Sequence, residues 1–184
     1  MAVMLCGALG GARVANAQQQ QPQQGPERYF GALSTGDGLR LTRNTDYGQG
    51  TFVPAFIDAL AAYVLPGARL RHGVGLGASV NYTDDGGYIE PVIAFEQLVL
   101  MPTYLVYADL NRDFLLLGHV GVPITVAGGP NAGFELAAAG GYRMLAGFGL
   151  LAELGLTTFV GTATSLHPAV TLELGVFLDY EVLP

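Results

Sequence analysis

The chain has few charges, no lysine and a single cysteine, Cys6. Charged residues make up 12% of its 184 positions, against roughly 25% in typical soluble proteins. All eight basic residues are arginines, and they form no basic patch along the sequence, which excludes nucleic acid as a partner. Because 51% of the residues are hydrophobic, we expect something other than water to cover part of the surface.

Long hydrophobic runs are also missing, although a membrane-spanning helix needs about 20 consecutive apolar residues. The best window, 114–134, carries no formal charge but contains Pro123, Pro130 and the pair Gly128-Gly129. A helix would break at these residues. Lipid cannot satisfy free backbone groups or open sheet edges, so a membrane protein without spanning helices must be a closed barrel.

The N-terminal residues predict export. Residues 2–12 are short, apolar and rich in small side chains, and Ala15-Asn16-Ala17 is a small-residue cleavage site. We therefore predict a signal peptide over 1–17, a disordered tether rich in glutamine and proline over 18–27, and one barrel domain over 28–184. Cleavage after Ala17 removes the only cysteine, which suits an oxidising periplasm.

From residue 28 onward, apolar residues recur at every second position, the periodicity of β-strands. In the last segment Leu172, Leu174 and Val176 alternate with Glu173 and Gly175. The pattern predicts eight strands, over 29–42, 52–64, 70–81, 88–108, 114–125, 134–144, 148–160 and 170–182. Ten strands result if the Asp37-Gly38 pair is a hairpin turn and a break falls at Met101-Pro102.

The connections between these segments alternate in length. Those over 43–50, 82–87, 127–131 and 162–166 fall at one end of the predicted barrel, and shorter ones over 65–68, 109–112 and 145–146 fall at the other. Long outer loops, short periplasmic turns and both termini in the periplasm are typical of outer-membrane barrels with an even strand number. The predicted fold class is therefore all-β, an antiparallel transmembrane β-barrel.

The stretch "HGVGLGAS", residues 72–79, looks like a phosphate-binding loop. However, Gly73, Gly75 and Gly77 recur every second residue, and no helix pattern follows them, so they indicate a strand rather than a nucleotide site. On the inner face of a narrow barrel they would leave room for bulky neighbours such as Arg71, Arg143 or Glu153. Tyrosines near strand ends are expected to form an interfacial girdle: Tyr29, Tyr63, Tyr88, Tyr104, Tyr107, Tyr142 and Tyr180.

The polar face of the strands gathers acidic residues with few bases. We predict that they form one polar network that fills the lumen, made of Asp58, Glu96, His119, Glu135, Arg143, Glu153, Glu173 and Arg71. The interpretation we favour is an ion-pair network with no further role. The alternative, which gives these residues a specific chemical role, is a metal or proton site. No catalytic, cofactor-binding or metal-binding residues are predicted.

An enzymatic alternative would use Ser165, His167 and Glu135 near the outer rim, with Ser79 close by, as in barrels that modify lipids. No nucleophile-elbow motif supports it, and isolated serine and histidine residues are common by chance. A third alternative is a soluble periplasmic barrel of the lipocalin type that binds a small apolar ligand. The many Gly and Ala residues on the polar face favour a crowded interior instead of a solvated surface.

The export signal, the period-two segments and the loop asymmetry resemble those of the small eight-stranded outer-membrane barrels of the outer-membrane protein A and X type. The resemblance implies the outer membrane of a Gram-negative bacterium, a structural or envelope-integrity role, and a monomer. Its partners would be the lipid bilayer, lipopolysaccharide and the barrel-assembly machinery. Such barrels usually end on an aromatic residue that this machinery reads. This sequence departs from that pattern, because it ends Val182-Leu183-Pro184, and Tyr180 or Phe177 would take the role instead. Eight strands leave no aqueous channel, so a diffusion porin is disfavoured.

Overall fold

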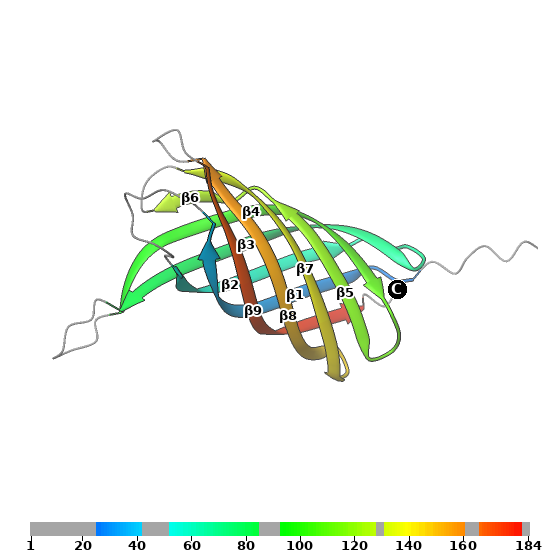
Figure 1. Ribbon diagram of the computed structural model, residues 1–184. Helices are drawn as coiled ribbons and strands as arrows, with labels where there is room; N and C mark the ends of the chain where they lie inside the picture. Colours follow the sequence, from blue (N-terminus) through cyan, green and yellow to red (C-terminus); the bar gives the residue numbers. More distant parts are fainter. Residues whose placement is uncertain (1–24, 42–51, 85–92, 128–130, 161–165, 182–184) are drawn as a thin grey trace, which may run out of the picture.

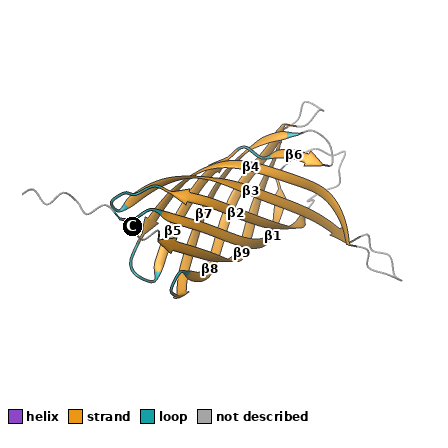
Figure 2. Ribbon diagram, turned by 180° about the vertical axis from the view of Figure 1, so that it is seen from behind, coloured by secondary structure: helices purple, strands orange, loops and turns teal. Residues whose placement is uncertain are grey.

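The strands of the protein form one closed antiparallel barrel (Figure 1). The computed structural model describes residues 25–41, 52–84, 93–127, 131–160 and 166–181. Its strand segments are β1 (Arg28–Arg40), β2 (Phe52–Val64), β3 (Leu70–Asp84), β4 (Ile93–Asp109), β5 (Phe114–Gly121), β6 (Ile124–Ala127), β7 (Ala132–Leu145), β8 (Phe148–Val160) and β9 (Leu166–Glu181). Each pairs with its neighbours, and β1 pairs with β9, so the sheet has no free edge among these strands (Figure 2).

The nine segments make eight barrel strands, as predicted, because β5 and β6 are two parts of one strand. Both lie between β4 and β7, and the interruption falls at Val122-Pro123. Proline has no N–H to donate to the ladder, yet the carbonyl of Pro123 still accepts a hydrogen bond from the Gly133 N–H at 2.8 Å.

The two breaks that would have given ten strands are absent from the described strands. Met101-Pro102 lies within the continuous β4. Asp37-Gly38 lies within β1, where the pairing with β2 shifts register between Gly36 and Gly38. The shift is a local irregularity of one strand, which bends a sheet without ending the strand.

The two faces of the barrel differ in the way the sequence predicted. In β8 the burial pattern alternates residue by residue, with Leu151 and Glu153 buried and Leu150 and Leu154 exposed. In β9, Glu173 and Phe177 face the lumen and Tyr180 faces outward. Of the two aromatic residues considered for recognition by the assembly machinery, Tyr180 alone is thus on the outer surface.

Both ends of the described chain lie at one end of the barrel, which we call the terminal end. Arg28 at the start of β1 pairs with Glu181 at the end of β9, and the short turns after β2, β4 and β7 lie at the same end (Figure 1). The turn from β7 to β8 contains Gly147 at a φ of 77°, a backbone conformation that favours glycine. The opposite end, where the described parts of β1, β3, β6 and β8 finish, we call the loop end.

An apolar layer crosses the lumen near the terminal end. Its buried side chains are Phe30, Ala62, Val64, Leu105, Tyr107, Leu115, Leu117, Ala139, Leu151 and Phe177. Gly73 and Gly77 face inward next to Leu105 and Met101, and not next to the arginines or Glu153 as we expected. The lumen is therefore not uniformly polar.

Most tyrosines whose side chains the structure describes lie on the outside of the barrel. Tyr29, Tyr104, Tyr142 and Tyr180 are exposed, and the rings of Tyr29 and Tyr63 lie 5.5 Å apart. Tyr107, however, is fully buried in the lumen, so its assignment to the girdle is wrong. Its position in β4 has the inward phase, and arginine and aspartate side chains bind its hydroxyl.

Several predicted features lie outside the described residues. These are the signal peptide, the tether up to residue 24, Tyr88 and Ser165. Of the predicted tether, residues 25–27 are described, and the Gly25 N–H donates a hydrogen bond to the Gly67 carbonyl.

Candidate functional site in the barrel lumen

Two polar clusters lie on either side of the apolar layer. The loop-end cluster consists of Asp58, His119, Glu135, Glu153 and Glu173, which β2, β5, β7, β8 and β9 contribute in turn. The arginine cluster at the terminal end consists of Arg28, Arg71, Tyr107, Asp109, Arg143, Asp179 and Glu181. Phe177 stands between the two clusters on β9, because it is the inward residue between Gly175 and Asp179.

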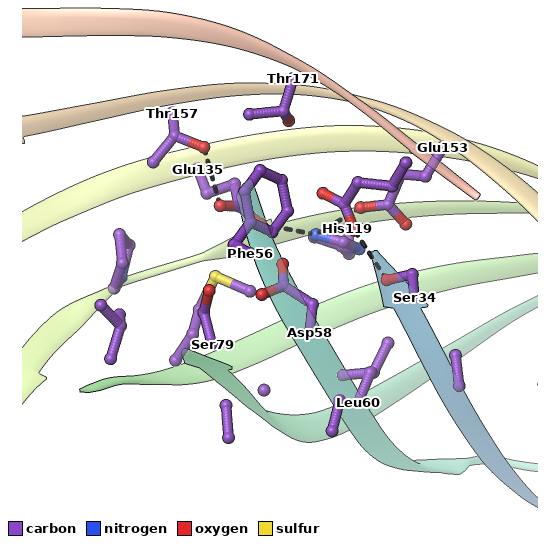
Figure 3. A pocket seen from close by; sticks show the side chains of 18 of the residues that line it. Ser34, Phe56, Asp58, Leu60, Ser79, His119, Glu135, Glu153, Thr157 and Thr171 are labelled. Atoms are coloured by element: carbon purple, nitrogen blue, oxygen red, sulfur yellow. Dashed lines mark hydrogen bonds and ion pairs between the residues drawn. The ribbon is translucent and has the colours of Figure 1, made fainter. Parts of the chain in front are cut away.

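His119 is the centre of the loop-end cluster (Figure 3). Its Nε2 lies 3.0 Å from Oε1 of Glu135 and 3.7 Å from Oε1 of Glu153. The other oxygen of Glu135, Oε2, accepts a hydrogen bond of 2.8 Å from the Thr157 hydroxyl. Three neighbouring strands thus bring one imidazole and two carboxylates together.

The remaining two carboxylates of this cluster come from strands farther round the barrel. Glu173 lies opposite Glu153 in the β8–β9 register, and its Oε2 accepts a hydrogen bond of 2.7 Å from the Ser34 hydroxyl. Oδ1 of Asp58 is buried without a hydrogen-bond partner among the described residues. Four carboxyl groups therefore share this part of the lumen with one imidazole.

A cavity of about 110 Å³ lies at the centre of the loop-end cluster. All five cluster residues line it, and Phe56, Leu60 and Leu151 contribute apolar walls. Figure 3 shows Asp58, His119, Glu135 and Glu153 directed into this shared space. None of the described lining residues is an arginine, so the negative charges there have no guanidinium partner among the described side chains.

The arginine cluster contains more ion pairs, although Arg28 Nε, Arg71 Nε and Asp179 Oδ1 are buried without a hydrogen-bond partner among the described residues. Oδ2 of Asp179 accepts hydrogen bonds from Arg28 Nη1 at 2.8 Å, Arg143 Nη2 at 2.8 Å and the Tyr107 hydroxyl at 2.7 Å. Asp109 accepts one from Arg71 at 2.7 Å. The side chain of Asp179 is only 1% exposed. Charge-assisted bonds of this kind satisfy buried ions that would otherwise be costly.

The sequence grouped all the lumen residues in one network, whereas the structure separates them. Arg71 and Arg143 lie in the arginine cluster, because Arg71 is near the start of β3 and Arg143 near the end of β7. Glu96 occupies a register shift in β4, where Asn81 pairs with Gln97 and Tyr82 with Phe95. The side chain of Glu96 is outside the described residues.

Five members of the arginine cluster were absent from the predicted network: Arg28, Tyr107, Asp109, Asp179 and Glu181. The signal that would have found them is strand phase. Tyr107 and Asp109 are two residues apart in β4, and Asp179 is two residues from Phe177 in β9. Arg28 and Asp109 fall just outside the predicted strands 29–42 and 88–108, so the alternation did not assign them to a face.

The residues of the enzymatic alternative are only partly described. Ser79 lines the loop-end cavity, and Glu135 contacts His119. Ser165 and the side chain of His167 lie outside the described residues. Within the described part of the chain there is no helix of the length and hydrophobicity needed to cross a membrane.

Comparisons with other proteins place the fold in a class. No protein family matches the sequence, and no curated protein matches it. The chain is similar in structure to Ail, the attachment invasion locus protein of Yersinia pestis, solved with the heparin analogue sucrose octasulfate. That match has a TM-score of 0.51 and 10% identity, and covers 85% of this chain and 99% of Ail.

A second solved structure agrees with the first. Neisserial surface protein A, NspA, gives a TM-score of 0.51 at 13% identity, with 83% of this chain and 97% of NspA covered. At this level of identity the similarity concerns the fold alone. The class defined by the fold is the closed antiparallel β-barrel. Within that class, the chain has the eight-stranded architecture of the small outer-membrane barrels Ail and NspA.

Proposed function

We propose that the protein is an exported outer-membrane β-barrel with a structural or envelope-integrity role, a lumen closed by side chains and no catalytic activity. The observation that carries this proposal is the distribution of apolar side chains. Large apolar residues cover the outer face, including Leu33, Ile57, Val74, Leu76, Leu116, Leu136, Leu150, Leu154, Leu156, Leu172 and Leu174. Water does not stabilise so large an apolar surface, and a bilayer does.

The inner face supports the same proposal. It carries buried charged residues at both clusters, with Glu153, Glu173 and Asp179 among them. A soluble barrel that binds an apolar ligand would have the reverse arrangement, with an apolar cavity and a polar outer face. The cavity of about 110 Å³ is also smaller than the roughly 300–1,000 Å³ of typical ligand pockets.

The apolar layer argues against a diffusion pore. Val64, Leu105, Leu115 and Phe177 are each buried at 1% exposure or less, and side chains fill the interior of a barrel of eight strands. The arginine cluster adds a second layer of paired side chains at the terminal end. A lumen closed in this way fits a role of the whole barrel in the envelope better than a role in transport.

The arrangement of the ends sets the proposed orientation. Both described termini lie at the terminal end, which we place in the periplasm as in other barrels of even strand number. The loop end then faces lipopolysaccharide and the outside of the cell. Insertion would depend on the barrel-assembly machinery.

The experiment that tests this proposal combines membrane fractionation with gel mobility. We expect the full chain in the outer-membrane fraction, and a refolded sample in detergent with sheet-rich circular dichroism. Its band should migrate differently before and after boiling, as folded barrels of this class do. A monomer that stays folded and soluble without detergent would contradict the membrane assignment.

A further inference from the structure

We propose that the loop-end cluster binds one divalent transition-metal ion, with Zn²⁺ as the representative ion, through His119 Nε2, Glu135 and Glu153. This site lies in the lumen of the barrel, so the inference goes beyond the proposed envelope role and does not depend on it. The three side chains come from the neighbouring strands β5, β7 and β8. Their donor atoms lie within 4.8 Å of one another.

The distances between the donor atoms fit a metal ion. Zn–N and Zn–O bonds of about 2.0–2.2 Å at tetrahedral angles place neighbouring donor atoms roughly 3.3–3.6 Å apart. The two distances from His119 Nε2, 3.0 Å to Glu135 and 3.7 Å to Glu153, lie on either side of this range. Small side-chain rotations would therefore complete the geometry without a change in the backbone.

Glu153 supplies a further sign of a missing ligand. It is 8% exposed and directed into the cavity (Figure 3), and among the described residues its Oε1 has only the His119 Nε2 contact at 3.7 Å, which is longer than a hydrogen bond. Buried polar groups are nearly always paired, and a buried carboxylate without a partner is costly. A cation in the cavity would supply that partner.

Asp58 provides an unpaired oxygen in the same cavity. Its Oδ1 is buried without a hydrogen-bond partner in the described structure. Three carboxylates, those of Asp58, Glu135 and Glu153, surround one imidazole, while the described arginines of the lumen lie beyond the apolar layer. A divalent ion would offset this excess of negative charge, and Asp58 is placed to contribute an oxygen directly or through water.

The wall of the barrel also holds the ligands in place. The Thr157 hydroxyl binds Oε2 of Glu135 at 2.8 Å, which leaves Oε1 directed toward His119, and such outer contacts orient metal ligands. In the strand register His119 lies opposite Ala137, which in turn lies opposite Gly155. These small residues leave space between the three ligands.

The donor set selects the kind of ion. Imidazole nitrogen with carboxylate oxygens suits Zn²⁺ and related transition metals, whereas Ca²⁺ requires six to eight oxygens. Mg²⁺ requires near-octahedral oxygen ligands and retains water. We therefore expect Zn²⁺ to bind far more tightly than Ca²⁺ or Mg²⁺.

The test is calorimetric titration of ZnCl₂ into the full chain, refolded in detergent and treated with a chelator. We expect one ion per chain, and at least a tenfold loss of affinity in His119→Gln and in Glu153→Gln. The matched control is His72→Gln, because His72 lies on the outer face, where Nδ1 contacts the Tyr104 hydroxyl. This variant should bind Zn²⁺ like the unsubstituted chain.

Two results would overturn the proposal: the absence of saturable binding near one ion per chain, or unchanged affinity in His119→Gln. Retention of the heat-modifiable band shows that each variant has folded. If a lumen variant does not fold, the test uses the unsubstituted chain and replaces Zn²⁺ with Co²⁺. Visible absorption typical of four-coordinate Co²⁺, removed by Zn²⁺, supports the site, and its absence rules the site out.

Discussion

Glu153 on β8 and Glu173 on β9 lie directly opposite each other in the barrel wall, and both side chains point into the lumen. They are 8% and 5% exposed. Like charges at directly opposed positions of an antiparallel pair are destabilising, so the register disfavours a negative charge on both carboxyl groups at once. The hydroxyl of Ser34 donates a hydrogen bond to Glu173, which partly offsets the repulsion between the two carboxylates.

Removal of one of the two charges should therefore stabilise the barrel. We expect Glu173→Gln to raise the free energy of unfolding by roughly 0.2–1 kcal/mol in metal-free buffer, because the amide oxygen still accepts the Ser34 hydrogen bond. Urea unfolding in detergent, followed by circular dichroism because the chain has no tryptophan, measures the change. Asp113→Asn, at an exposed position, is the control and should have little effect. A lower stability of Glu173→Gln would contradict the repulsion.

In the arginine cluster, the loss of one charge should instead lower the stability of the barrel. Asp179→Asn keeps the side-chain shape but leaves Arg28 and Arg143 without the carboxylate that accepts from both. Removal of one partner of a buried ion pair typically costs about 3–5 kcal/mol. We expect a loss of this size in urea unfolding, and a lower temperature at which the folded band disappears on gels.

Glu181 offers the control for this prediction. It also pairs with Arg28, but its side chain is 45% exposed at the end of β9. Solvent-exposed ion pairs contribute at most about 1 kcal/mol, so Glu181→Gln should be nearly neutral. Equal losses of unfolding free energy in Asp179→Asn and Glu181→Gln would show that burial does not determine how much each ion pair of this cluster contributes to stability.

The outer face predicts how position along a strand affects insertion into a bilayer. Leu154 lies at the middle of β8 with 58% of its surface exposed, and Leu145 lies at the end of β7 with 72% exposed. Arginine on the lipid face costs about 2–4 kcal/mol at the midplane and about 0–1 kcal/mol near the interface. Leu154→Arg should therefore reduce folding into liposomes strongly, and Leu145→Arg only slightly. A soluble barrel would tolerate both variants equally.

Two glycines on the adjacent strands β7 and β8 should differ sharply in their tolerance of alanine. A Cβ at Gly149 would collide with the Tyr142 carbonyl and the Phe177 ring, whereas one at Gly140 would meet nothing within 4 Å. Overpacking of this kind costs about 1–3 kcal/mol, so Gly149→Ala should destabilise the barrel, as urea unfolding would show. Gly140→Ala should be neutral or slightly stabilising. Comparable losses in both variants would mean that close contact inside the wall is not the cause.

Much of the wall was predictable from the sequence because one physical rule controls it. A strand with lipid on one face and a lumen on the other alternates strictly, so Leu172 and Leu174 were assigned outward and Glu173 inward, as the structure shows. The eight strands followed from the same alternation. The break at Pro123 was not foreseen, because the neighbouring residues keep the alternating phase.

The grouping of the lumen residues was not predictable in the same way. Alternation says which face a side chain occupies, but strand tilt and stagger set which residues meet across the lumen. Arg143 and Glu153 share the inward face of adjacent strands, yet they belong to different clusters separated by Leu151 and Phe177. Glu96 lies at a register shift, where a period-two pattern loses its phase.

The contact between Arg28 and Asp179 joins residues 151 positions apart, on the first and the last strand of the barrel. β1 also pairs with β9 along the whole length of β1, from Arg28↔Glu181 to Arg40↔Ala169. Synthesis and export of the chain must therefore be nearly complete before any intermediate can close, and until then β1 and β8 keep edges open to pairing with other chains. A chain that stops before β9 would lack both the closing strand and the acceptor for Arg28, and would be a substrate for aggregation or proteolysis instead of a smaller barrel.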